Sequence, residues 1–234
     1  MIEWALEGLD LNEEDRMDAY ELALSLPLLR VKKGKGFVFG HPTSKKTDDD
    51  EEESLQSMLI VNEIDPPREF QKEQDIYREV MHRLQHVCMF LKIKTADHPT
   101  NTIITATTQT ILERLDRMEQ NLKQLHERYG PKDKHRLVAN LGVSKNKNDD
   151  KNHESNSSYV HGEELMRQLC GMADAARRSC YVECASEEHR SFFEQYGFRV
   201  VGSEPIHHDT QKEKPTSSLT VFLMVRETEE ESEA

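Results

Sequence analysis

The sequence has few cysteines, and they form neither a metal-binding pattern nor a disulfide framework. The four cysteines are Cys88, Cys170, Cys180 and Cys184. None belongs to a Cys-x-x-Cys pair, and all lie in or beside apolar segments, which favours buried, reduced thiols. The eleven histidines add no metal motif, because only His207 and His208 are adjacent and no spaced Cys or His accompanies them. We therefore expect no metal site.

The chain also lacks a long apolar run and an excess of basic residues. No stretch approaches the roughly 20 apolar residues that span a bilayer, and Met1 to Glu7 show no signal-peptide pattern. We expect an intracellular protein, cytoplasmic or nuclear, that does not enter a membrane. The net charge is −13, which disfavours a nucleic-acid partner because phosphate contacts need concentrated lysine and arginine.

Polar segments are abundant instead. Charged residues make up 32% of the chain and hydrophobic residues 35%, a balance typical of a folded domain with long solvated segments. Residues 43–54 and 144–157 contain no apolar side chain, so we predict disordered inserts there and an acidic tail at 229–234. The 234 residues suit one domain over residues 1–228.

The N-terminal half predicts three helices and two strands. Helical periodicity and an asparagine cap indicate helices at 12–26, 76–91 and 111–125, and short apolar runs indicate strands at 36–40 and 57–61. Pro27 should disturb the end of the first helix, and a threonine-rich link over 95–110 should separate the other two. Their apolar stripes are too short for a coiled coil, so we expect them to face the core.

After Gly130-Pro131 the sequence alternates between strands and helices. Strands are expected at 136–143, 180–184, 198–201 and 219–225, and helices from Gly162 and over 187–195. The polar stretch 203–218 is predicted to be a loop. This order indicates a mixed α/β fold, in which helices flank a twisted mixed sheet.

Five segments of this region resemble, in order, the motifs of the GCN5-related N-acetyltransferases. They are Asn140-Leu-Gly-Val143, the helix from Gly162, Tyr181-Val-Glu-Cys-Ala-Ser186, Phe192-Phe-Glu-Gln-Tyr-Gly-Phe198 and Leu223-Met-Val-Arg226. The resemblance covers residues 136–227, and in the N-terminal half it extends only to the order of elements. It implies a divergent member of that superfamily, with acetyl-CoA as co-substrate and an amine as acceptor.

The resemblance also implies where acetyl-CoA would bind. Two parallel strands, here 137–143 and 180–185, would splay apart so that the pantetheine arm pairs with exposed backbone. The pyrophosphate would lie at the N-terminus of the next helix, where amides and the helix dipole favour anions. The cofactor contacts that follow are Leu141, Gly142, Val143, Ser158, Val160, His161, Gly162, His189 and Phe193.

Three features depart from the family pattern. Of the phosphate loop only Gly162 survives, and Val160 brings a β-branched side chain where the backbone should approach phosphate. The loop before it is longer than the pattern. Phe193 stands where the family often has a tyrosine general acid, and it has no proton to give. His189 replaces a frequent asparagine and can hydrogen-bond in its place.

Several of these residues have a structural alternative. Gly162 belongs either to a phosphate loop or to an ordinary helix start, with Glu163 and Glu164 complementing the dipole of the first turn. Glu183 is either a general base acting through water or a strand residue paired with Arg177, Arg178 or a backbone amide. Phe193 faces the cofactor or packs in the core. His135 and His161 are expected to be exposed polar residues.

Two functions fit this sequence. The first is an acyl-CoA-dependent N-acetyltransferase that transfers acetyl directly to an amine of a small molecule or protein, where an acidic chain favours a basic acceptor. The second is a catalytically inactive relative that keeps the fold as a binding or regulatory module, which Val160, Phe193 and the long loop favour. A protein built only on its long helices is disfavoured, because the C-terminal strands would have no role.

Overall fold

The computed structural model describes residues 6, 9, 11, 13–42, 55–64, 100–143, 157–207 and 218–228. The predicted helix 76–91, the insert 43–54, nearly all of the insert 144–157 and the tail 229–234 lie outside these residues. Of the second insert only Ser157 is described, and it begins a helix.

A six-stranded sheet organises the described part of the chain, with strand order β1-β2-β3-β4-β6-β5. The strands are β1 (Gly36–Pro42), β2 (Leu55–Ile64), β3 (His135–Val143), β4 (Ser179–Cys184), β5 (Arg199–His207) and β6 (Ser218–Arg226). The pair β3–β4 is parallel, and the other four pairs between described strands are antiparallel. The expectation of a mixed α/β fold is confirmed.

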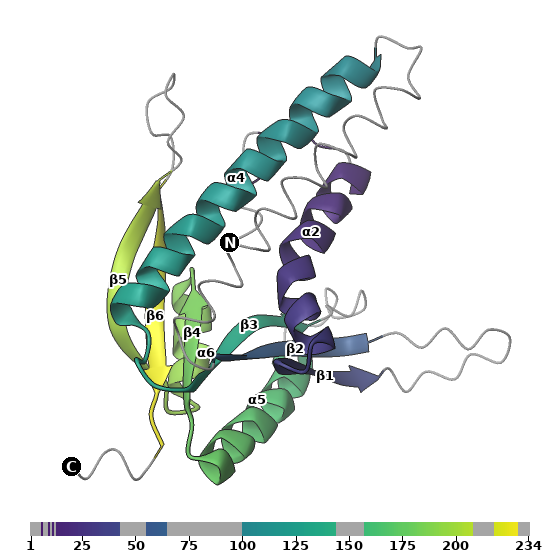
Figure 1. Ribbon diagram of the computed structural model, residues 1–234. Helices are drawn as coiled ribbons and strands as arrows, with labels where there is room; N and C mark the ends of the chain where they lie inside the picture. Colours follow the sequence, from purple (N-terminus) through teal and green to yellow (C-terminus); the bar gives the residue numbers. More distant parts are fainter. Residues whose placement is uncertain are drawn as a thin grey trace, which may run out of the picture.

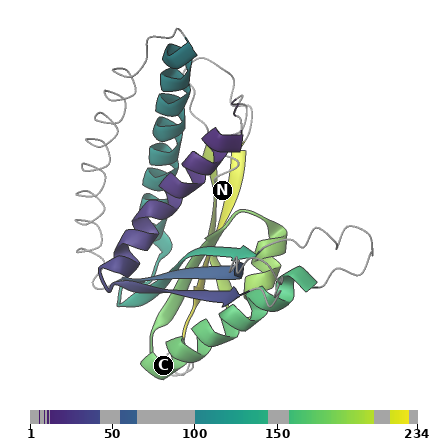
Figure 2. The ribbon, with the colours of Figure 1, turned by 90° about the vertical axis from the view of Figure 1, so that its right-hand side faces the viewer.

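Helices cover both faces of this sheet (Figure 1, Figure 2). They are α2 (Glu13–Lys32), α4 (Thr100–Tyr129), α5 (Ser157–Ala176) and α6 (Glu187–Glu194). On one face α5 packs against β1 to β4, while on the other α2 lies over β1 and β2 and α4 lies against β5 and β6. Within the described ranges, no helix is long and apolar enough to cross a membrane.

Side chains of β4 alternate between two apolar cores, as the pleat of a strand requires. Val182 and Cys184 join Leu169 of α5 in the core on one face. Tyr181 joins Leu125 of α4 in the core on the other. The apolar stripe predicted at 111–125 therefore faces the core, as expected.

Three elements extend beyond their predicted ends. α2 continues through Pro27 to Lys32, because Arg30 in its last turn is buried and its Nη2 donates to the Glu63 carbonyl at 2.8 Å. α4 begins at Thr100, so most of the predicted threonine-rich link is helical, each added residue gaining a backbone hydrogen bond. β5 runs to His207 because its polar second half pairs with β6.

Two methionines on these helices lie toward solvent. Met17 of α2 and Met172 of α5 are 56% and 38% exposed. Ala19 on α2 packs against α4, and Ala173 on α5 lies in the core beside the sheet together with Leu165, Met166 and Leu169. A small side chain at a buried position lets a helix backbone lie close to its neighbour.

Glu63 of β2 joins the beginnings of β3 and β4. Its Oε1 lies 3.2 Å from Nη1 of Arg178, which precedes β4, and 3.7 Å from Nη2 of Arg136 in β3. Arg136 is 5% exposed, so removal of the Glu63 carboxylate would leave a buried charge without its partner. One side chain thus links three neighbouring strands at the same end of the sheet.

The turn after α6 depends on a glycine and on an arginine from β6. Gly197 has a φ of 80°, in the left-handed region that favours glycine. Arg226 donates from Nε to the Tyr196 carbonyl at 3.0 Å, and its two Nη atoms contact the two carboxylate oxygens of Asp174 on α5 at 2.7 and 2.8 Å. These contacts fix α5, β6 and the turn to one another.

Gly130, directly after α4, lies close against His126 in the last turn of that helix. A Cβ at this position would lie 2.5 Å from the His126 carbonyl oxygen and would collide with the His126 ring. We expect Gly130→Ala to lower the free energy of unfolding by about 1–3 kcal/mol through overpacking, as measured by urea denaturation. The matched control is Gly171→Ala on α5, where nothing lies within 4 Å of a Cβ, and it should stabilise by up to about 1 kcal/mol. Similar effects of the two substitutions would contradict this packing argument.

Candidate functional site

β3 and β4 pair in parallel over a short distance and then separate. Four residue pairs join them, of which the last is Val138 with Val182. Beyond that point β3 continues in register with β2, while Glu183 and Cys184 continue in register with β6. The inner edges of the two strands therefore open into a V-shaped gap, across which their backbone groups have no strand partner. Figure 1 shows β1, β2 and β3 running in a different direction from β5 and β6. The splay that the resemblance implies is present.

A β-bulge marks the point where the gap opens. Val138 lies opposite Val61 of β2, and Asn140 lies opposite the adjacent residue Ile60. Ala139 is thus the extra residue of β3, without a partner in either neighbouring strand. A bulge reverses the faces to which the following side chains point.

This reversal decides which side chains border the gap. Leu141 packs into the core beside α5, so Asn140 and Gly142 face the opposite side, where Tyr181 packs against α4. Glu183, two residues after Tyr181, shares that face. A Cβ on Gly142 would meet nothing among the described residues except Asn140 Oδ1, at 3.8 Å. As far as the described residues go, the α4 side of the gap is open beside Gly142 and is bordered by the polar side chains of Asn140 and Glu183.

Glu183 is a titratable group at this opening. Its side chain is half-buried, and its Oε1 accepts a hydrogen bond from the Tyr181 hydroxyl at 3.0 Å. Burial raises the pKa of Glu183 to about 8, and the Tyr181 hydrogen bond opposes that rise. Arg178, one of its candidate partners, pairs with Glu63 instead. A carboxylate that titrates near neutral pH is suited to accept a proton from a reacting amine.

Two histidines hold the ring of Tyr181. His126 of α4 stacks on it with ring centroids 4.6 Å apart and planes at 10°. The Nε2 atoms of His126 and His135 are 2.7 Å apart, and His135 Nδ1 is 2.7 Å from the Asp133 carbonyl oxygen. A carbonyl only accepts, so His135 Nδ1 donates to it and His135 Nε2 accepts from His126.

Both histidines are neutral at pH 7. Burial lowers the pKa of each ring, to about 3 for His126. His135, expected from the sequence to be exposed, is fully buried. It is the first residue of β3 and faces α4, and its two ring nitrogens are hydrogen-bonded to His126 and to the Asp133 carbonyl. The expectation of an exposed His135 is wrong.

α5 begins at Ser157, earlier than the predicted start at Gly162. Gly162 therefore lies in the second turn, where it is buried, and Ser158, Val160 and His161 are helical as well. The amides without an intrahelical acceptor belong to the first four helical residues. At about 1.5 Å per residue, the helix start lies about 7.5 Å along the axis from Gly162. An anion at this N-terminus would thus bind farther from Gly162 than the resemblance implies.

The two glutamates after Gly162 are turned toward an arginine. Glu163 Oε2 lies 3.0 Å from Arg167 Nη2, and Glu164 Oε2 lies 3.6 Å from Arg167 Nη1. They lie in the second turn rather than the first, which contains no acidic residue. Their charge is therefore partly compensated within the helix and stands apart from its N-terminal amides.

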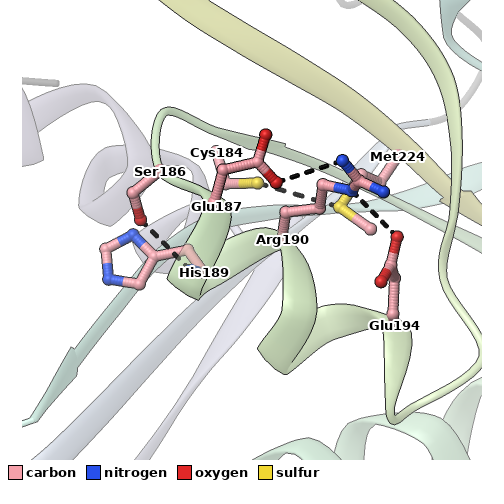
Figure 3. Close-up of polar contacts among 7 residues, drawn as sticks. All are labelled: Cys184, Ser186, Glu187, His189, Arg190, Glu194 and Met224. Carbon is pink, nitrogen blue, oxygen red and sulfur yellow. Dashed lines mark hydrogen bonds and ion pairs between the residues drawn. The ribbon is translucent and has the colours of Figure 1, made fainter.

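α6 follows the end of β4 directly, and Figure 3 shows its polar contacts. Ser186 caps the helix, its Oγ accepting from the His189 backbone N–H at 3.1 Å. The His189 ring is exposed beside Ser186, and Arg190 projects from the other side of the helix between Glu187 and Glu194, at 3.0 and 2.9 Å. The His189 ring is therefore free of the ion pairs on α6, and its contact with a cofactor stays a prediction.

Phe193 lies in the core at the position of the family's tyrosine. It is 5% exposed and packs against the rings of Phe192 and Phe198, with centroids 5.4 and 5.6 Å away. Its side chain contributes packing and no exchangeable proton. The site therefore has a candidate base in Glu183 and no acid on α6 at this position.

Sequence reasoning assigned no role to Asn140 at the opening, or to Tyr181 and His126 in the core beside it. The spacing of Tyr181 and Glu183 does carry a signal, because residues two apart on a strand share a face. Asn140 could not be placed, since its direction depends on the bulge at Ala139. His126 could not be placed either, since its contact with Tyr181 depends on how α4 crosses the sheet.

Comparison by sequence finds no matching protein-family model and no matching curated protein. In the described ranges no group of three His, Cys, Asp or Glu side chains is arranged to hold a metal ion.

Comparison of structures finds N-acetyltransferases among the solved structures that match this chain. A Drosophila melanogaster polyamine N-acetyltransferase that forms N-acetylagmatine is 15% identical, with 93% of this chain and 82% of that one covered and a TM-score of 0.42. An agmatine N-acetyltransferase is 15% identical over 97% and 86%, at 0.47. Arylalkylamine N-acetyltransferase 2 from Aedes aegypti is 12% identical over 88% and 79%, at 0.46.

Glu183 makes the stability of the fold depend on pH. Its pKa is about 8 in the folded protein against 4.5 for an ordinary glutamate, so the folded state binds more protons between these values. Its contribution is fully present below about pH 4.5 and is lost as the pH rises through 8. We expect Glu183→Gln, which cannot ionise, to raise the free energy of unfolding at pH 9 by on the order of 2 kcal/mol, allowing for solvent screening of a half-buried group.

Urea denaturation at pH 5 and pH 9 measures this difference. The matched control is Glu204→Gln on β5, which also removes a carboxylate that accepts from a tyrosine, Tyr129. We expect the control to show no gain at pH 9. An equal gain for both variants, or a Glu183→Gln effect that does not change with pH, would show that the carboxylate is not strained by burial.

Proposed function

We propose that this chain binds acetyl-CoA in the gap between β3 and β4 and transfers the acetyl group to an amine. The observation that carries the proposal is the separation of two parallel strands after Val138 and Val182. The pantetheine arm is an extended chain with two amides, and it can pair with the free backbone edge like an added strand. Leu141, Gly142 and Val143 lie along that edge of β3.

The direction of α5 supports the same binding mode. Its C-terminal end, Ala176, leads within three residues into Ser179 at the start of β4, where the strands are still paired. Its N-terminus therefore points toward the open end of the gap, as in other right-handed crossovers between parallel strands. The unpaired amides of its first turn can bind the pyrophosphate there.

The residues at the opening supply the proton acceptor for the reaction. The Glu183 carboxylate takes a proton from the amine, directly or through a water, and the amine nitrogen attacks the thioester carbonyl carbon. The backbone N–H of Ala139, which lacks a strand partner, can donate to the oxyanion. The carbon–sulfur bond then breaks, and the thiolate takes its proton from solvent because Phe193 has none to give.

A second candidate function is a module that binds acyl-CoA, or another extended ligand, without transferring the acyl group. Two observations favour it. Phe193 is buried and carries no hydroxyl, and the residues that match the family's phosphate loop, 157–162, form part of α5. Binding without turnover on a panel of primary amines would identify this function.

Acetyl-CoA binding tests the proposed gap. We expect wild-type protein to bind acetyl-CoA in isothermal titration calorimetry, and Gly142→Trp to weaken binding at least tenfold because an indole on β3 would fill the open space beside the gap. The matched control is Gly171→Trp, an equally large side chain at an exposed position of α5, which should bind as the wild type does. Absence of binding by wild-type protein at millimolar acetyl-CoA would end the acetyltransferase proposal.

Acetyl transfer tests the role of Glu183. In assays of thiol release with primary amines, we expect Glu183→Gln to lower kcat by about 10²- to 10⁴-fold, the usual contribution of a general base, and to leave acetyl-CoA affinity nearly unchanged. Glu204→Gln should keep wild-type kcat. A Glu183→Gln variant with wild-type kcat would remove this residue from the mechanism and leave the binding gap unaffected.

A further inference from the structure

The Glu183 carboxylate is held at one of its two oxygens. Oε1 accepts from the Tyr181 hydroxyl at 3.0 Å. Within the described residues Oε2 accepts no hydrogen bond, and it is not among the polar atoms that are buried without a partner. One oxygen is thus fixed by the protein, and the other is available at the opening of the gap.

The hydroxyl that fixes Oε1 is itself held in place. Tyr181 is fully buried, and its ring lies in parallel stacking contact with His126. His126 in turn is hydrogen-bonded to His135, which is anchored to the Asp133 carbonyl. A tyrosine enclosed in this way has little freedom to turn its hydroxyl away from Glu183.

We propose that Tyr181 is a positioning residue of the acyl-transfer site: its hydroxyl fixes the Glu183 carboxylate at the open end of the β3–β4 pair, and the His126–His135 pair fixes its ring. This inference rests on the proposed function of the gap. Tyr181 itself does not touch the substrate, because it lies in the core between β4 and α4. It acts through Glu183 alone.

Among the described residues, few other charges lie near Tyr181 and Glu183. The described titratable side chains against the Tyr181 ring are His126 from α4 and His135 from β3, and Lys132 adds a positive charge near both. From β6, the residues opposite Tyr181 and Glu183 are Val225 and Leu223, which carry no charge. The Tyr181 hydroxyl is therefore the main polar influence on the carboxylate besides its burial.

The experiment compares Tyr181→Phe with Tyr129→Phe. Each substitution removes one tyrosine hydroxyl that donates to a glutamate, Glu183 in the first and Glu204 in the second, and only the first lies at the gap. The carboxyl carbon of Glu183 is titrated by NMR in the ligand-free variants, with Glu183→Gln to assign its signal. The pH profile of kcat/KM is then measured with acetyl-CoA and a primary amine, and thermal unfolding checks the fold.

We expect Tyr181→Phe to move the NMR midpoint of Glu183 upward by about one pH unit, tenfold in its ionisation constant. The acid limb of the pH profile should move by the same amount, with the KM for acetyl-CoA unchanged. Tyr129→Phe should move neither. A loss of rate at every pH without a shift of the acid limb is what a merely structural role would give.

The outcomes separate the two proposals. Two results would show that Tyr181 is not a positioning residue while the proposed function stands. The first is an NMR midpoint of Glu183 that stays at its wild-type value in a folded Tyr181→Phe protein. The second is an acid limb of the pH profile that does not move in Tyr181→Phe, although the wild type transfers acetyl. If the wild type binds acetyl-CoA but transfers no acetyl group, the proposed transferase function fails, and the role of Tyr181 in it falls as well, whatever the NMR titration shows.

Discussion

Competition for backbone hydrogen bonds along β3 and β4 determines the architecture of this site. Each strand has an antiparallel partner on its outer side, β2 for β3 and β6 for β4, and those pairings run farther than the parallel pairing between them. The twist of each outer pair carries its inner strand away from the other. A gap with free backbone groups is the result, and its position follows from where the parallel register ends.

The two sides of the gap have different chemistry because the bulge at Ala139 sets which residues face each side. Leu141 adds to the apolar core beside α5, while Asn140 and Glu183 border the α4 side. Nearby, the buried His126–His135 pair gives polar contacts without a net charge, because burial lowers the pKa of both rings. Holding such a carboxylate out of water costs stability at alkaline pH, a cost that is typical of functional sites.

The sequence is informative where local pattern decides the structure. The four strands of the C-terminal half begin within one residue of their predicted starts, because their short apolar runs are local signals. The end of α2 and the start of α5 were not predicted as closely. Pro27 and Gly162 are ordinary signals for a helix boundary, but α2 continues past Pro27, with Arg30 buried against Glu63, and α5 begins at Ser157, before Gly162.

In the candidate site, too, some residues are predicted by local sequence and others depend on contacts between distant segments. Glu183 could be nominated from its motif, because the residue lies in a short strand of recognisable sequence. Its partner Tyr181, its elevated pKa and the neighbouring histidine pair depend on contacts between segments far apart in the chain, with α4 supplying His126 from 55 residues before Tyr181. Burial of that kind has no local signature, and so His135 was expected at the surface.

The Glu63 contacts with Arg136 and Arg178 have a mechanical consequence for the gap. The parallel pairing ends at Val138 and Val182, so a force that separates β3 and β4 further would act first on the hydrogen bonds next to that pair. The Glu63 carboxylate lies on the paired side and contacts both Arg136 of β3 and Arg178 before β4. Further separation of the strands would have to break these ion pairs as well as the backbone hydrogen bonds.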